Sequence, residues 1–181
     1  MGRLQRRPKS GWVVVDLDEC HARLYPTVSH VWAPHGEYPV LPLKDVHGKC
    51  VVFGAIDVHT GRTFAHLAHS LAGAEQLRLL EQVVAAYPEQ RVLLIWDNGP
   101  THRNKQVAAW LATHPQVACF WLPPYCGDQA NPIEHFWRWF RECVTHNHLF
   151  QTVEELFTAA QQFFATFASD PAAVLSRLGL M

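Results

Sequence analysis

Two short apolar runs that end at acidic residues constrain the fold of this chain more than any other feature. Residues 12–15 (Trp-Val-Val-Val) lead into Asp16 and Asp18, and residues 92–96 (Val-Leu-Leu-Ile-Trp) lead into Asp97. A short apolar run without alternation is typical of a strand buried on both faces, as in a parallel sheet that helices cover. The sequence therefore predicts an α/β sheet with acidic residues where its buried strands end.

The rest of the chain predicts a mixed sheet with helices packed on it. Helical periodicity is absent before Gly73 and dominates after Pro132. Strands are predicted at residues 50–58, 62–68 and 117–122, and a further one is plausible at residues 23–29. Helices are predicted at residues 74–87, 104–113, 133–144 and 153–167. This order, in which antiparallel strands precede any helix, predicts a mixed five-stranded sheet with helices on both faces.

Length and composition predict one compact domain. The chain has 181 residues, of which 49% are hydrophobic and 17% charged, and this is too apolar for a disordered chain. Residues 11–181 are expected to form the domain, after a basic arm or linker at residues 1–10. The net charge of −1 excludes a strongly basic DNA-binding module, so we expect contact with nucleic acid through a local patch.

The cysteines and the length of the apolar runs predict a cytoplasmic protein. The five cysteines are scattered and form no C-x-x-C pair, which fits a reducing compartment. The longest apolar runs are far shorter than the roughly 20 residues that cross a bilayer. We therefore expect no disulfide framework and no membrane partner.

Three acidic residues carry the predicted chemistry: Asp18, Asp97 and Glu134. If the two apolar strands are parallel neighbours, their carboxyl ends lie side by side, where open α/β sheets build their sites. Neighbouring carboxylates repel one another, and Mg²⁺ or Mn²⁺ relieves that repulsion by taking oxygen ligands. Two such ions can activate a water or a 3′-hydroxyl and stabilise the leaving oxygen. The three acids therefore predict a phosphodiester-transfer site.

Each acid also has a purely structural interpretation. Asp97 begins the sequence Asp-Asn-Gly-Pro, in which all four residues favour turns. Glu134 lies three residues after Asn131 and fits the capping box of a helix. Asp16 and Asp18 share one face of a strand, and either could simply mark where the strand enters solvent. The combination, more than any single residue, favours the catalytic interpretation.

The segments around these acids resemble those of the mariner-like DDE transposases, in their bacterial insertion-sequence branch. The similar segments are residues 14–19 (Val-Val-Asp-Leu-Asp-Glu), residues 94–102 (Leu-Ile-Trp-Asp-Asn-Gly-Pro-Thr-His) and residues 122–137, which contain Asn-Pro-Ile-Glu. The resemblance covers nearly the whole chain and implies an RNase H-like fold. It also implies that Asp18, Asp97 and Glu134 bind two Mg²⁺ or Mn²⁺ ions, cleave transposon ends and join the freed 3′-hydroxyl to target DNA.

Five further residues have predicted supporting roles. Asp16 is expected to lie behind the metal-binding acid of its strand, hydrogen-bonded to Asn98 or His102. Asn98 and His102 match family positions and could orient the second acid, with a role at a helix N-terminus as the alternative. Arg138 and Arg141 share a helical face with the third acid, so we expect DNA phosphate contacts there, or a solvated salt bridge at Arg138.

The resemblance also implies partners and a setting. DNA is the expected substrate, and the helix-turn-helix domain that family members carry ahead of the catalytic domain is expected upstream or in trans. We further expect a homodimer in the active complex and a bacterial protein that associates with the nucleoid when active. The alternatives are another nuclease on the same fold, or an inactive or domesticated protein that binds DNA or a partner. Three intact acids favour the enzyme.

Overall fold

Five strands form one mixed sheet in the computed structural model, which describes residues 11–41, 47–99, 102, 104–123 and 131–180. The predicted basic arm lies outside the described residues. The strand order is β3-β2-β1-β4-β5, with β1–β4 and β4–β5 parallel and the other pairs antiparallel. The strands are β1 (Trp12–Arg23), β2 (Lys49–Asp57), β3 (Thr63–Ala68), β4 (Arg91–Trp96) and β5 (Val117–Trp121). The predicted five-stranded sheet is confirmed.

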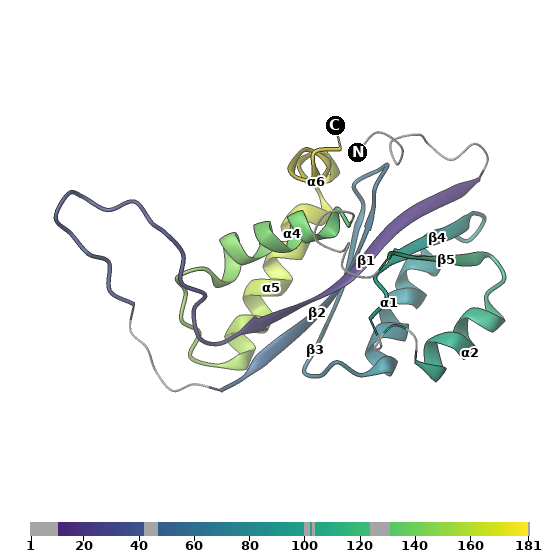
Figure 1. Ribbon diagram of the computed structural model, residues 1–181, viewed down its shortest axis with the longest axis horizontal. Helices are drawn as coiled ribbons and strands as arrows, with labels where there is room; N and C mark the ends of the chain where they lie inside the picture. Colours follow the sequence, from purple (N-terminus) through teal and green to yellow (C-terminus); the bar gives the residue numbers. More distant parts are fainter. Residues whose placement is uncertain (1–10, 42–46, 100–101, 103, 124–130, 181) are drawn as a thin grey trace.

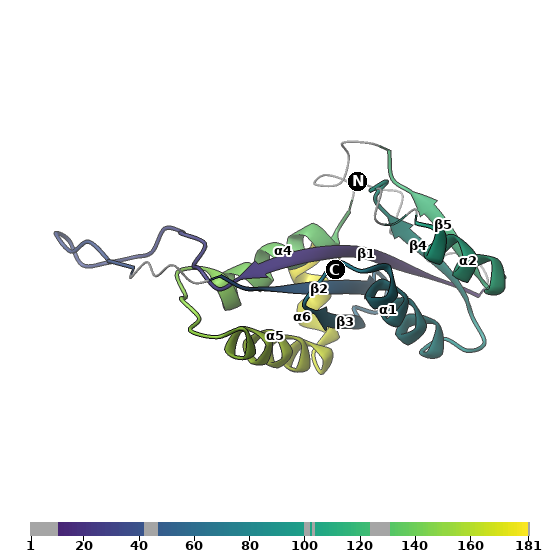
Figure 2. The ribbon, with the colours of Figure 1, turned by 90° about the horizontal axis from the view of Figure 1, so that it is seen from below.

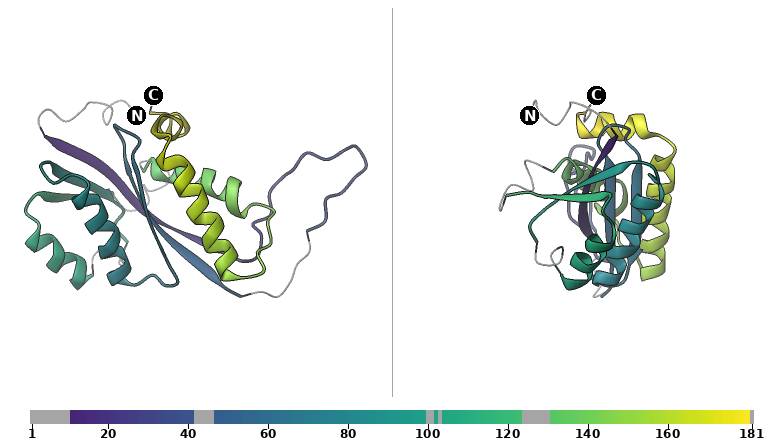
Figure 3. Two further views of the ribbon diagram at one scale, coloured as in Figure 1. Left: turned by 180° about the vertical axis from the view of Figure 1, so that it is seen from behind. Right: turned by 90° about the vertical axis from the view of Figure 1, so that its right-hand side faces the viewer.

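Helices cover both faces of this sheet, as predicted. They are α1 (Gly73–Ala85), α2 (Lys105–Thr113), α4 (Ile133–Phe140), the π-helix η1 (Arg141–Thr145), α5 (Val153–Ala168) and α6 (Pro171–Leu178). Alternate residues of β1 belong to different cores: Leu17 packs with α1 and α2, whereas Cys20 and Ala22 pack with α4, α5 and α6. Figure 1 shows α1 and α2 at the right and the other helices to their left, and Figure 3 gives two further views of this arrangement.

The strand expected at residues 23–29 does not form. Arg23 is instead the last residue of β1, which continues well past the acids because it pairs with β2 as far as Arg23↔Lys49. Residues 24–29 contain only an isolated bridge, between Thr27 and His146. The first strand is therefore 12 residues long, and the sheet needs no additional member.

The segment that follows β1, of which residues 24–41 are described, extends away from the rest of the chain (Figures 1 and 2). It carries apolar side chains that are largely exposed, among them Val28, Trp32, Tyr38 and Val40. Scattered apolar residues are normal on a surface, but several on one projecting segment are typical of a contact surface.

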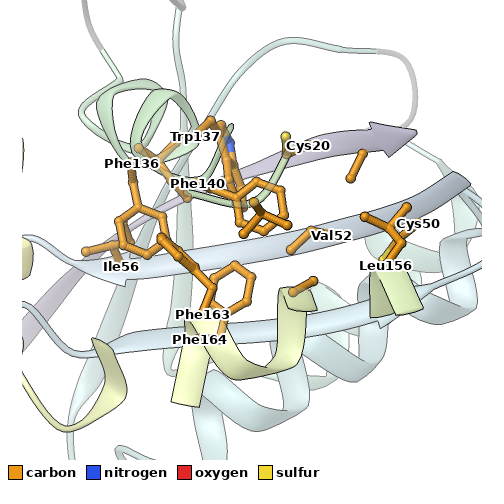
Figure 4. Packing of buried hydrophobic residues seen from close by; sticks show 14 of the residues in the cluster. Cys20, Cys50, Val52, Ile56, Phe136, Trp137, Phe140, Leu156, Phe163 and Phe164 are labelled. Carbon is orange, nitrogen blue, oxygen red and sulfur yellow. The ribbon is translucent and has the colours of Figure 1, made fainter. Parts of the chain in front are cut away.

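Aromatic side chains fill the space between the sheet and the helices α4 and α5. Phe136 and Phe140 of α4 meet Phe163 of α5 edge to face, with ring centroids 5.4 and 5.3 Å apart. Figure 4 shows these rings and Trp137 gathered over Val52 and Ile56 of β2. This packing fixes α4, the helix that carries Glu134, against β1 and β2.

Candidate active site

The parallel pairing of β1 and β4 brings two of the predicted acids to one edge of the sheet. The pairing ends at Asp16↔Ile95, so Asp18 follows two residues later on β1 and Asp97 comes directly after β4. The predicted parallel arrangement is confirmed. The expectation that Asp18 closes its strand is wrong, because antiparallel pairing with β2 continues there through Asp18↔Gly54.

Asp18 lies at the centre of a group of negative charges. Burial, together with the charges of Glu134, Glu19 and Asp97, raises the pKa of its carboxyl to about 8. Its Oδ2 accepts a hydrogen bond from Nε1 of Trp137, at 2.9 Å. Two of the acids that the sequence singled out, Asp97 and Glu134, therefore lie within electrostatic reach of the third, Asp18.

Asp97 is only half-buried, with 44% of its side chain open to solvent. Its Oδ1 accepts a hydrogen bond from the backbone N–H of Gly99 at 3.0 Å, and His102 Nδ1 pairs with the same oxygen. This is the side-chain-to-backbone hydrogen bond expected from the turn interpretation of Asp97. The turn directs the carboxylate without burying it, so it is compatible with a chemical role.

His102 joins Asp97 to a fourth acid, Glu19. Its ring is buried against Trp96, with ring centroids 4.6 Å apart, and Nε2 lies 2.6 Å from Oε2 of Glu19. Gln76 of α1 donates to the other oxygen of Glu19 at 2.8 Å. Burial lowers the pKa of His102, but the hydrogen bond and charge of Glu19, with the charge of Asp97, raise it overall.

Glu19 is a residue that the sequence interpretation missed. By strand alternation it lies on the face opposite Asp18, in line with the apolar Leu17. An acid on that buried face needs a partner, and this requirement was the available signal. Its partners, His102 and Gln76, come from segments distant in sequence.

Asp16 is buried behind the acids, with 1% of its surface exposed. The expected hydrogen bond between Asp16 and His102 does not form, because both ring nitrogens of His102 face other acids, Glu19 and Asp97. Among the described residues Oδ1 of Asp16 has no hydrogen-bond partner, and burial raises the pKa of its carboxyl to about 7. The other predicted partner, Asn98, is exposed.

Glu134 lies in the first turn of α4 and forms no capping box there, since α4 has no side-chain cap. Asn131 instead ties the start of the helix to the sheet. Its Nδ2 donates to the carbonyl oxygen of Leu17 at 3.2 Å, and its Oδ1 accepts from the N–H of Ile133 at 3.3 Å. The start of α4 is therefore fixed next to Asp18, with the Glu134 carboxylate acting on Asp18 through space.

The two arginines of the same helical region lie in different surroundings. Arg138 is exposed, and within the described part of the chain it forms no ion pair with Glu134. Arg141 is half-buried and hydrogen-bonds to the thiol of Cys20, where its charge partly offsets the effect of burial on the thiol pKa. Arg138 is thus the more accessible cation.

No three His, Cys, Asp or Glu side chains among the described residues already stand close enough together to hold a metal ion. The acids form a charge cluster and not a finished coordination shell. Oδ2 of Asp18 and Oδ1 of Asp97 are engaged by protein donors, which leaves one other oxygen on each carboxylate.

The described helices include none that is long and apolar enough to cross a membrane.

Comparisons with known proteins agree with this geometry. Residues 13–157 match the family model described as DDE superfamily endonuclease. The uncharacterized 39 kDa protein of insertion element IS630 from Shigella sonnei is 24% identical over 155 residues, which cover 85% of this chain and 45% of that protein. The resemblance predicted from the acid-bearing segments is confirmed.

Solved structures show the same fold. The Mos1 transposase paired-end complex with the left transposon end matches at a TM-score of 0.64 and 16% identity, covering 92% of this chain and 53% of that one. The Mos1 mariner paired-end complex with Mg matches at 0.61 and 17%, with 92% and 53% covered. The chain thus spans about half the length of these relatives, and the RNase H-like fold expected from its sequence is confirmed.

Proposed function

The chain belongs to the DDE superfamily of endonucleases, and from this premise we propose that residues 11–181 are the catalytic domain of a DNA transposase of the mariner and IS630 type. Such a domain cleaves phosphodiester bonds at transposon ends and transfers the freed strands to target DNA. One observation carries the proposal. Asp18 of β1 is buried at one edge of the sheet, where Glu134 at the start of α4 and Asp97, directly after the parallel neighbour β4, come within electrostatic reach of it; burial and then these charges raise the pKa of Asp18.

The acids at this edge fit a divalent cation. Burial and three neighbouring negative charges disfavour the ionised form of Asp18, and a bound cation offsets both effects. The donors are all carboxylates, which suit Mg²⁺ or Mn²⁺ better than zinc. Asp18, Asp97 and Glu134 are the proposed ligands of two such ions. The Mos1 complexes with Mg and with Mn support the use of a divalent cation. Bound there, the ions would activate a water or a 3′-hydroxyl and stabilise the leaving oxygen.

The protein's own residues hold the second acid in place. His102 fixes one oxygen of Asp97, and the hydrogen bond from His102 to Glu19 fixes the ring. Gln76 in turn anchors Glu19 to α1. This chain of contacts restricts the rotation of Asp97, which is otherwise half exposed, and so prepares it to bind metal.

DNA is the proposed substrate, and a helix-turn-helix domain supplied upstream or in trans would select the transposon ends. The Mos1 complexes contain transposon DNA, and the net charge of this chain is too low for strong binding on its own. Arg138 and Arg141 are the proposed phosphate contacts beside the acids, Arg138 being the exposed one. A homodimer in the active complex would cover the apolar side chains of the segment after β1. The active protein would then be bound to bacterial DNA and associated with the nucleoid.

Cleavage of a labelled duplex tests this function. With Mg²⁺ or Mn²⁺ present, the wild-type chain is expected to nick DNA, and Asp97→Asn and Glu134→Gln are expected to abolish nicking while they keep the fold. As a control for folding, the circular dichroism spectra of both variants should match the spectrum of the wild-type protein. Full activity in either variant would contradict the proposed site. DNA binding without any cleavage by the wild type would favour the inactive, domesticated alternative.

A further inference from the structure

Asp18 has a hydrogen-bond donor that comes from the core of the protein. The donor is the indole N–H of Trp137, whose side chain is fully buried among the rings of α4 and α5. Its Nε1 lies 2.9 Å from Oδ2 of Asp18. A buried tryptophan N–H needs a partner, and this one uses the acid proposed to bind metal.

The sheet is shaped to receive this ring. Gly54 of β2 pairs with Asp18 across the two strands, and the six-membered ring of Trp137 occupies the space that a side chain would fill there. A Cβ at residue 54 would overlap Cη2 of Trp137 and lie 2.7 Å from its Cζ2. The glycine is therefore required because the ring approaches the strand closely, not because of an unusual backbone conformation.

Trp137 and Glu134 belong to the same helix, three residues apart, and therefore lie on neighbouring positions of one helical face. A bond from Trp137 to Asp18 thus fixes how the helix of the third acid sits on the strand of the first. The bond between Asn131 and Leu17 fixes the same helix at its start. The hydrogen bonds of Asn131, before Glu134 in the chain, and of Trp137, after it, thus fix the position of α4 relative to β1.

We propose that Trp137 is a positioning residue of the metal site: its N–H holds Oδ2 of Asp18 and so presents the other carboxylate oxygen to the bound ion, and Gly54 provides the space for its ring. This inference rests on the proposed function, since it takes Asp18 as a metal ligand. It assigns to a core tryptophan a role in orienting a ligand, in addition to packing.

Trp137→Phe tests the hydrogen bond, because phenylalanine keeps an aromatic ring in the core and removes the N–H. The affinity for Mn²⁺, measured on the full chain by the electron paramagnetic resonance signal of free Mn²⁺, is expected to fall by roughly 10- to 100-fold, as for other residues that orient metal ligands. The matched control is Trp139→Phe, in the same helix and the same aromatic cluster. Trp139 contacts Phe163 and Phe167, and its indole forms a hydrogen bond with the thiol of Cys143 instead of with an acid. Its Mn²⁺ affinity should remain within about 2-fold of wild type.

Gly54→Ala tests the shape of the site. In the wild-type background the new methyl group strikes the Trp137 ring, so we expect a clear fall in the urea midpoint of unfolding. In the Trp137→Phe background the ring atoms that it would strike are absent, so the same substitution should lower the midpoint much less. The double variant should bind Mn²⁺ as weakly as Trp137→Phe alone, because both lack the indole N–H that bonds to Asp18. Equal effects of Gly54→Ala in both backgrounds would refute the contact.

A measurement on the unmodified protein decides the matter even if Trp137→Phe does not fold. The indole N–H resonance of Trp137, assigned by triple-resonance NMR, is expected to shift during a titration with Mg²⁺, while that of Trp139 stays in place. The absence of a shift at Trp137 under saturating Mg²⁺ would overturn the inference.

The outcomes separate this inference from the function on which it rests. If Asp97→Asn and Glu134→Gln lose Mn²⁺ while Trp137→Phe binds it as tightly as wild type or more tightly, only the positioning role is wrong. If Asp97→Asn and Glu134→Gln both keep wild-type affinity for Mn²⁺, the metal site itself is wrong and the positioning role fails with it.

Discussion

Asp16 is predicted to make the free energy of unfolding depend on pH. Its carboxyl is buried, one oxygen lacks a partner among the described residues, and burial raises its pKa from 3.8 to about 7. Between these two values the folded state binds a proton that the unfolded state does not. The contribution of Asp16 to stability is therefore fully present below about pH 4 and is lost as pH rises to about 7, beyond which the loss is constant. At 1.36 kcal/mol per pKa unit, the total loss is on the order of 4 kcal/mol.

Asp16→Asn removes this titration. An uncharged amide in the same place carries a cost of its own, but that cost does not change with pH, so the comparison of two pH values isolates the ionisation. Urea unfolding with EDTA, at constant ionic strength, should show wild-type stability falling between pH 4.5 and pH 8 relative to the variant, by roughly 2 to 4 kcal/mol. The slope of unfolding against urea must be the same for both proteins.

The control is Asp57→Asn. Asp57 is also buried, but its carboxylate accepts hydrogen bonds from the N–H groups of His59 and Thr60 and from the hydroxyl of Tyr87. Losing such acceptors should destabilise the fold by roughly 1 to 3 kcal/mol at pH 8. A stability difference between wild type and Asp16→Asn that is the same at pH 4.5 and pH 8 would refute the assignment of Asp16 as a buried acid whose ionised form burial disfavours.

Three further predictions concern the site and its substrate. Asp18→Ala should eliminate Mg²⁺-dependent cleavage, whereas Asp16→Ala should reduce it by roughly 10- to 100-fold in the same nicking assay; the reverse order would place the metal ligand one pleat repeat away on β1. Glu19→Gln should lower the pKa of His102, because it removes the carboxylate that stabilises the imidazolium. A histidine NMR titration measures this pKa, and an unchanged value would refute the link. The chain alone should bind duplex DNA weakly, with little preference for terminal repeats and a steep fall with salt in fluorescence anisotropy; tight, sequence-specific binding at physiological salt would contradict the need for a separate DNA-recognition domain.

The sequence was most informative where structure depends on local pattern. The apolar run that precedes Asp97 predicted a strand buried on both faces, and β4 confirms it, since Leu94 and Ile95 are both buried and belong to different core clusters. The length of β1 was not predictable in the same way. Its continuation from Asp18 to Arg23 depends on pairing with β2, whose partner residues lie 26 or more positions later in the chain. The polar sequence after Asp18 therefore suggested that the strand ends there.

The residues of the site show the same difference between local pattern and tertiary packing. The three acids were evident because each lies where an element was predicted to begin or end. Trp137 and Glu19 were not evident, because their roles depend on which groups tertiary packing brings to them. A tryptophan among Ile133, Phe136 and Phe140 has the pattern of core packing, and only the tertiary structure, in which the ring packs on Gly54, brings its N–H to Asp18.

One short helix, α6, was also missed. It is eight residues long, and Asp170 caps it by accepting a hydrogen bond from the N–H of Ala173. Asp-Pro at its start is a valid helix signal, but a helix of two turns has too few apolar positions for its period to be recognised.

The central claim is that Asp18, Asp97 and Glu134 together bind divalent ions. Anomalous diffraction from crystals of the wild-type chain grown with Mn²⁺ tests it most directly, because the signal locates the ions without reference to activity. We predict two peaks roughly 3.5 to 4 Å apart, both bounded by these three carboxylates. Crystals at saturating Mn²⁺ with no peak at these acids, or with peaks only at other side chains, would contradict the claim.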